Sequence, residues 1–229
     1  MHRSVCICGL LPRLATRTRV LLVVHQLEAK KPTNTGVVAA RCLANSAVIY
    51  RGRAPVEPPP DDPSLDGESL PGLRSVGPAD ADPLDAELRA DVEPVLLFPH
   101  PTARPLETWR GSEKPVLLVV PDGTWSQAAR TRIRLGALAQ LPCASVQTCD
   151  EAVAVDRLRR PPGPGRLATL EALALALGVL EDPAVADALM RVYRIMTERT
   201  LWTNGRLTAA EVTGGIPAGA RSHDPLNLR

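Results

Sequence analysis

The chain has 229 residues, of which 45% are apolar and 3% aromatic, and its formal net charge is +2. This length allows one good core or two small ones, built mainly from Leu, Val and Ala. No apolar run approaches the ~20 residues that span a bilayer, and the five cysteines lack the spacing of a disulfide framework. We therefore expect a cytoplasmic protein with no membrane partner.

The small net charge conceals an uneven distribution. From Pro55 to Pro94 the chain carries 11 acidic and two basic residues, whereas the remainder carries 25 basic and 14 acidic residues. A basic body is compatible with a polyanionic partner such as RNA. Residues 54–92 are also rich in Pro, Asp, Gly and Ser, which predicts a flexible acidic insertion in a single domain spanning residues 1–229. A solvated spacer is the commoner explanation, and an acidic mimic of RNA is the alternative.

Short apolar runs alternate with helical patterns along the chain. A strand at residues 19–25 is followed by a helix that begins at Asn34 or Thr35 and by a strand at 47–50. Beyond the insertion, strands at 95–98 and 116–120 precede a helix at 125–141. A weaker strand at 145–148 and helices at 170–180 and 185–202 complete the pattern. This alternation predicts an α/β fold, with a mostly parallel sheet flanked by helices.

Residues 121–127 form the segment with the strongest chemical signal. Thr124 and Gln127 have the spacing of a capping box, which places Asp122 and Gly123 in the turn at the carboxyl end of a strand. Ligands of open α/β sheets collect at that edge. Trp125 could stack on a base or an adenine ring, or anchor the core. A well-formed turn without a ligand is the competing interpretation.

Basic residues gather in two further places. Arg157, Arg159 and Arg160 stand beside prolines, and Arg130 and Arg134 share one face of the expected helix at 125–141. Arginine forks match phosphate geometry, although solvated arginines are also common. In the next helix Thr169 is the expected N-cap, and Glu171 lies in the first turn, where negative charge is favoured.

Two other candidates are less specific. Cys6 and Cys8 supply half of a zinc site with no second pair nearby, so no metal is predicted and zinc stays doubtful. His25, at the end of the first strand, could act in catalysis or be structural. The sequence has no Walker A loop, G-x-S-x-G elbow or H-E-x-x-H helix, so kinase, esterase and metalloprotease activities have no support.

The segment 117–128, LLVVPDGTWSQA, resembles the signature of DTW-domain proteins, the tRNA-uridine aminocarboxypropyltransferases. Five other blocks agree with that family and occur in its order: Cys6-Ile7-Cys8, His25-x-x-Glu28 with Asn34-Thr35-Gly36, Leu97-Phe98-Pro99, Arg157 to Pro161, and Leu167 to Ala172. Together they cover most of the chain outside residues 54–92. Six ordered blocks make a much more specific match than the D-T-W triplet.

The resemblance implies a knotted, SPOUT-like α/β fold and the use of S-adenosylmethionine. Family members transfer its 3-amino-3-carboxypropyl group to N3 of a uridine in tRNA. The resemblance implies these site residues: Asp122, Thr124 and Trp125 for catalysis; Phe98, Pro99, Asp122, Gly123, Leu167, Thr169 and Glu171 for cofactor binding; and His25, Asn34, Arg130, Arg134, Arg157, Arg159 and Arg160 for RNA binding. It implies no protein partner.

Within this scheme, Asp122 is the carboxylate best placed by sequence to take the proton from uridine N3, and burial would raise its pKa toward a useful range. Many members also carry a C-x-x-C pair before the Cys6-Ile7-Cys8 motif, which this sequence lacks, and Ala168 stands where a Ser is usual. Two alternative functions stay open. One is methyl transfer to RNA by the same type of fold, and the other is RNA binding without catalysis.

Overall fold

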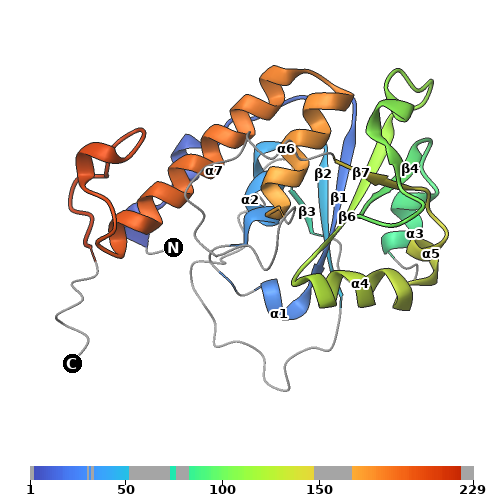
Figure 1. The fold of residues 1–229 in the computed structure, drawn as a ribbon, viewed down its shortest axis with the longest axis horizontal. Coiled ribbons are helices and arrows are strands. Elements are labelled where there is room, and N and C mark those ends of the chain that lie inside the picture. The colour runs from blue at the N-terminus through green and yellow to red at the C-terminus, as the bar shows by residue number, and fades with distance from the viewer. Residues whose placement is uncertain are drawn as a thin grey trace.

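The computed structural model describes residues 3–29, 31, 34–51, 73–75, 83–146 and 167–222. Its centre is a parallel sheet of seven strands in the order β3-β2-β1-β6-β4-β7-β5 (Figure 1). The strands are β1 Arg19–His25, β2 Ser46–Arg51, β3 Leu73–Ser75, β4 Glu93–Leu97, β5 Arg104–Pro105, β6 Val116–Asp122 and β7 Cys143–Ser145. The predicted α/β fold with a parallel sheet is therefore confirmed.

Helices cover both faces of this sheet. They are α1 Gln26–Ala29, α2 Thr35–Cys42, α3 Pro83–Leu88, α4 Trp125–Arg134, α5 Gly136–Ala139, α6 Thr169–Leu180 and α7 Pro183–Thr203, with short 3-10 turns at residues 3–5, 8–10, 106–109 and 209–211. Side chains alternate along β1, so that Leu22 packs with α2, α6 and α7, whereas Leu21 and Val23 pack with α3 and α5. The central strands β1 and β6 are buried on both faces of the sheet, which explains why their sequences are almost entirely apolar.

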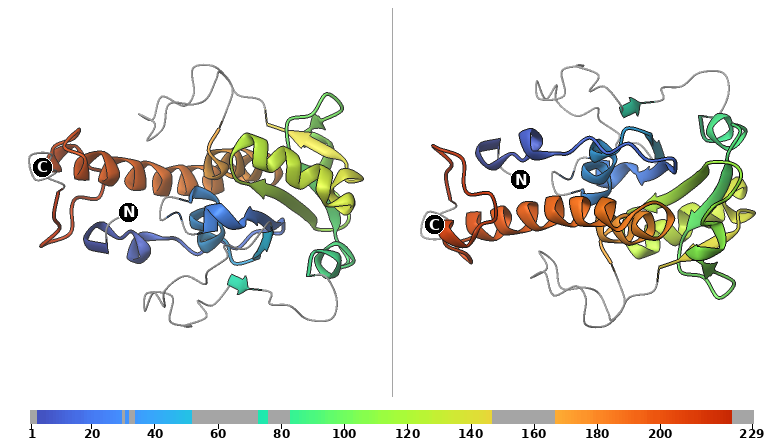
Figure 2. Two further views of the ribbon diagram at one scale, coloured as in Figure 1. Left: turned by 90° about the horizontal axis from the view of Figure 1, so that it is seen from below. Right: turned by 90° about the horizontal axis from the view of Figure 1, so that it is seen from above.

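Buried polar contacts hold the periphery to this sheet. Arg199 of α7 is 4% exposed and donates hydrogen bonds to the carbonyl groups of Val5, Cys6 and Gly215. The N-terminal segment therefore lies along the distal part of α7 (Figure 2). None of the helices in the described part of the chain is long and apolar enough to cross a membrane.

Three sequence-based expectations need correction. The expected helix at 125–141 is two helices, because Leu135 adopts an extended conformation between α4 and α5. Residues 83–92 were assigned to the acidic insertion, but they contain α3 and the segment that leads to β4. Leu84 of α3 is buried in the core, and Glu87 pairs with Arg19 of β1 at 2.5 Å. The third concerns Thr169, which is the first residue of α6; its N-cap is Ala168.

Other expectations fall on parts of the chain that are not described. Most of the predicted insertion, residues 52–72 and 76–82, lies outside the described residues, as do residues 147–166 with Arg157, Arg159 and Arg160. The knotted path implied by the resemblance stays a prediction.

Candidate functional site

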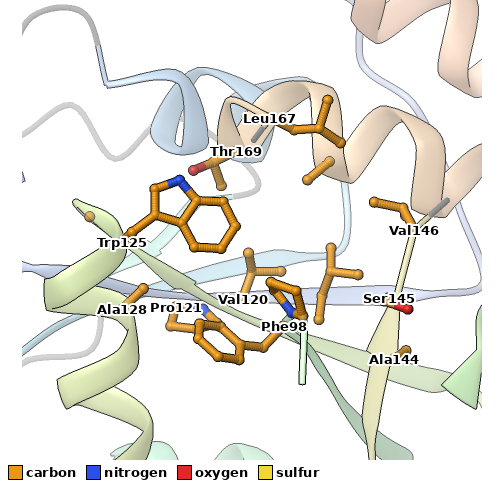
Figure 3. Close-up of a pocket in the computed structure, with 14 residues that line it drawn as sticks. Phe98, Val120, Pro121, Trp125, Ala128, Ala144, Ser145, Val146, Leu167 and Thr169 are labelled. Atoms are coloured by element: carbon orange, nitrogen blue, oxygen red, sulfur yellow. The ribbon is translucent and has the colours of Figure 1, made fainter. Parts of the chain in front are cut away.

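The carboxyl ends of β4, β6 and β7 border a pocket that encloses about 720 Å³, part of it open to solvent. Phe98 and Pro99 follow β4, Gly123 follows β6, and Ser145 and Val146 lie at the end of β7. The start of α4 closes one side and the start of α6 closes another (Figure 3). This position is the ligand-binding edge expected for an open α/β sheet.

The pocket wall is almost entirely apolar. It is formed by Leu97, Phe98, Pro99, Val120, Pro121, Gly123, Trp125, Ala128, Ala144, Ser145, Val146, Leu167, Thr169 and Ala172. None of these described lining residues has an ionisable side chain. The rings of Phe98 and Trp125 lie with centroids 6.4 Å apart and planes tilted by 49°, a geometry typical of packed aromatic pairs. Such a wall suits a flat, uncharged ring system.

Trp125 reaches the pocket because the turn before it is rigidly built. Thr124 is the N-cap of α4: its hydroxyl accepts the backbone N–H of Gln127, and the Gln127 side chain accepts the N–H of Thr124. The predicted capping box is therefore confirmed. A Cβ on Gly123 would lie 2.9 Å from Gln127 Oε1, so a glycine is required for the box to close. Thr124 is exposed and its visible role is to start the helix, whereas its predicted role in catalysis stays a prediction.

Asp122 occupies a different position from its neighbours in the same turn. Its side chain is 6% exposed, and it is not among the described residues that line the pocket, although Pro121 and Gly123 are. Oδ2 accepts a hydrogen bond of 2.7 Å from Asn34 Nδ2, and Oδ1 accepts one from the Thr169 hydroxyl. Both carboxylate oxygens are thus engaged by other parts of the chain.

The pKa of Asp122 is raised above its usual value. Burial is the largest cause, because it disfavours the charged form; the hydrogen bonds from Thr169 and Asn34 oppose it, and the nearby Glu28 adds to it. Glu28 is itself buried and pairs with Lys31 at 2.6 Å. The direction agrees with the shift predicted for this carboxyl group.

Asn34 and Thr169 each connect Asp122 to the first turn of a helix. Asn34 is the N-cap of α2, where its Oδ1 accepts the N–H of Val37 at 2.9 Å. Thr169 begins α6 and also lines the pocket. A Cβ on Gly36 would lie 3.0 Å from Asp122 Cγ and 3.1 Å from Thr169 Cγ2. The start of α2 therefore packs closely against the carboxyl group.

Glu171, predicted to bind the cofactor, has a structural task in this structure. It is 1% exposed, and its Oε2 accepts the backbone N–H of Ala168 at 2.7 Å. This is one half of a capping box, and the other half is missing because Ala168 has no hydroxyl. A Ser at this position would complete the cap of α6.

We therefore expect Ala168→Ser to stabilise the protein by about 0.5–2 kcal/mol, the typical contribution of a Ser N-cap relative to Ala. The backbone of Ala168 is already extended, with φ −70° and ψ 155°, so the hydroxyl needs no rearrangement to accept a bond from the first turn. Urea unfolding of the two proteins measures the difference. A matched Ala168→Val variant gains side-chain volume without the cap, and an equal gain in that variant would contradict the capping explanation.

The residues predicted to bind RNA fall into separate regions. Arg130 and Arg134 are exposed on α4, roughly one to three turns beyond Trp125. His25 is partly exposed at the end of β1, next to Gly123, and its Nδ1 accepts the N–H of Leu27 at 3.3 Å. Asn34 is engaged with Asp122 and Val37. All four roles in RNA binding stay predictions.

The cysteine pair near the N-terminus is exposed, and the Sγ atoms of Cys6 and Cys8 are 2.8 Å apart. Their hydrogen bond is the main reason why the pKa of Cys8 is raised. In the described part of the chain no group of three or more His, Cys, Asp or Glu side chains is arranged to hold a metal ion.

Sequence reasoning missed one side of the pocket. The weak strand predicted at 145–148 is β7 at 143–145, so Ser145 ends the strand and Val146 follows it. Ala128 and Ala172 are small residues inside helices. These residues line the pocket because β7, α4 and α6 meet at one edge of the sheet. The helical spacing of Ala128 from Trp125, and of Ala172 from Thr169, was the available signal.

Comparison with known proteins places this chain in a family. The DTW domain matches residues 1–201. A protein named tRNA-uridine aminocarboxypropyltransferase 2, from Drosophila melanogaster, is 28% identical over 194 residues, which cover 82% of this chain and 67% of the fly protein. The match to a solved structure, described as giving structural insights into the 2-OH methylation of C/U34 on tRNA, covers 78% of this chain and 97% of that chain, at 18% identity and a TM-score of 0.34. The match over residues 1–201 shows that the chain belongs to the DTW-domain family.

Proposed function

We propose that this protein transfers the 3-amino-3-carboxypropyl group of S-adenosylmethionine to N3 of a uridine in tRNA. One observation carries the proposal: the loops at residues 98–99, 122–125 and 167–171, which the resemblance to the family selected, meet around one apolar pocket. The activity in the name of the fly relative supports the same reaction.

The pocket fits the adenosine part of this cofactor. Its described wall is uncharged, and Trp125 and Phe98 offer aromatic surfaces on which a purine can stack. Aromatic faces also attract cations, and the sulfonium is one. The Ser145 hydroxyl is available to orient the bound molecule, whereas the Thr169 hydroxyl donates to Asp122.

S-adenosylmethionine supplies a carbon bonded to a sulfonium, so that the N3–C bond forms as the C–S bond breaks and sulfur leaves with the electron pair as a neutral thioether. The task of the chain is orientation, because the site must present the γ-carbon and shield the methyl group. Trp125, at the start of α4, and Phe98, which follows β4, offer bulky apolar surfaces suited to this shielding (Figure 3).

The N3 proton must also leave, and the sequence predicts Asp122 as its acceptor. In the structure both oxygens of this carboxyl group accept bonds from Asn34 and Thr169. A role as base would therefore require one of these bonds to be exchanged for a bond from N3–H.

We expect replacement of both Arg130 and Arg134 by Ala to weaken tRNA binding and to lower its salt dependence. Each arginine that contacts a phosphate adds about 1 to the magnitude of the slope of log affinity against log salt concentration. Loss of both arginines should therefore lower this magnitude by roughly 2. Fluorescence titrations at several salt concentrations measure the slope. Arg191 and Arg194 provide a matched control, because both are exposed on α7; an equal loss in the double Ala variant of these two would rule out a specific contribution of α4.

The reaction class is tested with two isotopically labelled preparations of S-adenosylmethionine. One carries the label in the methyl group and the other in the aminocarboxypropyl group, and each is incubated with the full chain and unmodified tRNA. The proposal predicts label in RNA only from the second preparation. Label from the first alone would identify a methyltransferase, and cofactor binding without transfer from either would identify an RNA-binding protein without this activity.

A further inference from the structure

We propose that Asp122 is a positioning residue that clamps the first turns of α2 and α6 against the pocket, and that it does not take the uridine proton. This inference rests on the proposed function, because it assigns a role within that reaction. It contradicts the base role predicted from the sequence, and the two roles make opposite predictions for the same variants.

The geometry points to a clamp because the carboxyl group joins three distant segments. Asn34 lies 88 residues before Asp122, and Thr169 lies 47 residues after it. One partner caps α2, and the other begins α6. A buried carboxylate that accepts two side-chain hydrogen bonds is a strong link, since bonds to a charged acceptor are about twice as strong as neutral ones.

The clamp reaches the pocket through Thr169. Its hydroxyl donates to Asp122 Oδ1, while the residue itself is part of the pocket wall. Leu167 and Ala172 line the same side: Leu167 stands just before the N-cap of α6, and Ala172 lies in its first turn. A change at Asp122 is therefore transmitted to three lining residues, although Asp122 does not belong to the described wall.

Close packing also leaves little room for a substrate base at the carboxyl group. The side chain is 6% exposed, and the backbone of Gly36 lies so near that even a Cβ would come within 3.0 Å of Asp122 Cγ and Oδ1. A base must lie within hydrogen-bond reach of the proton that it accepts. Here the positions around both oxygens are occupied by Asn34, Thr169 and the start of α2.

Asp122→Asn separates the two roles. An amide can preserve both contacts, with its oxygen accepting from Asn34 and its NH2 donating to the Thr169 hydroxyl, which can also accept. It cannot take a proton from N3. The clamp therefore predicts that Asp122→Asn keeps at least a tenth of the turnover and the pH profile of the natural protein.

Thr169→Val gives the complementary change, because it keeps the shape of the wall and removes the donor. We expect it to raise the dissociation constant of S-adenosylmethionine at least tenfold, with Thr169→Ser restoring most of the affinity. Thr197→Val is the matched control: Thr197 is 0% exposed in α7, and its hydroxyl has no hydrogen-bond partner among the described residues. This control should bind the cofactor as the natural protein does.

The experiment measures turnover against pH, cofactor affinity by calorimetry, and amide hydrogen exchange in α2 and α6 for these variants and Asp122→Ala. Retained turnover in Asp122→Asn, weakened affinity in Thr169→Val and faster exchange in the first turn of α6 in Asp122→Ala support the clamp. A loss of more than a thousandfold in Asp122→Asn with normal affinity in both Asp122→Asn and Thr169→Val would overturn it in favour of the base. If the natural protein makes no product, the proposed function fails. In that case exchange alone decides, and unchanged exchange in Asp122→Ala overturns the clamp.

Discussion

Trp125→Ala is expected to weaken the binding of S-adenosylmethionine by about 10- to 100-fold, or roughly 1.4–2.8 kcal/mol. The indole forms the wall of the pocket at the start of α4 and packs against Phe98, which is the single phenylalanine of the chain. Truncation to alanine removes a surface on which a purine can stack, and it also removes the aromatic partner of the Phe98 ring. Isothermal titration calorimetry with the cofactor measures the effect directly.

The effect of Trp125→Ala should be confined to the pocket. The capping box uses the side chains of Thr124 and Gln127, so α4 keeps its start, and alanine is a strong helix former. Circular dichroism should therefore show an unchanged helix content. Trp125→Phe is the matched control, because it keeps an aromatic face and should retain most of the affinity. A Trp125→Ala protein that binds the cofactor normally would show that the pocket is not the cofactor site.

Gly36→Ala is expected to lower both stability and cofactor affinity. Glycine to alanine within a helix normally stabilises by about 0.5–1 kcal/mol. Here the added Cβ would lie 3.0 Å from Asp122 Cγ and Oδ1 and 3.1 Å from Thr169 Cγ2, so the carboxyl group must shift. Overpacking of this kind typically costs about 1–3 kcal/mol. The sign of the change in unfolding free energy thus reports on the crowding around Asp122.

Gly136→Ala provides the comparison for this prediction. Gly136 begins α5, and a Cβ at that position would have no heavy atom within 4 Å. Urea unfolding should show a neutral or stabilising effect for Gly136→Ala and a destabilising one for Gly36→Ala. An equal gain in unfolding free energy in both variants would mean that α2 has room to move away from Asp122. Close packing around the carboxyl group would then not constrain the site.

The parts of the site that were predictable from sequence are local ones. The turn at residues 121–127 follows from a buried strand, a capping-box spacing and a glycine, and all three signals lie within one short segment. The edge of the sheet at which it lies follows from the alternation of strands and helices. Neither inference requires knowledge of which distant segments pack together.

The parts that sequence could not give depend on contacts between distant residues. Asp122 stands next to pocket residues in sequence, yet its side chain turns to Asn34 and Thr169, which no local pattern indicates. Thr169 was an attractive N-cap by residue type, but the chain enters α6 one residue earlier and frees its hydroxyl for Asp122. Similarly, residues 83–88 have an acidic composition, and α3 is nevertheless anchored by buried Leu84 and by the pairing of Glu87 with Arg19.

The most direct test of the proposed reaction is mass spectrometry of nucleosides from unmodified tRNA after incubation with the full chain and S-adenosylmethionine. The account predicts a uridine that is heavier by one aminocarboxypropyl group, with the new group on N3, and a large reduction of this product with Trp125→Ala. A methylated nucleoside in its place, or no new nucleoside despite measurable cofactor binding, would contradict it.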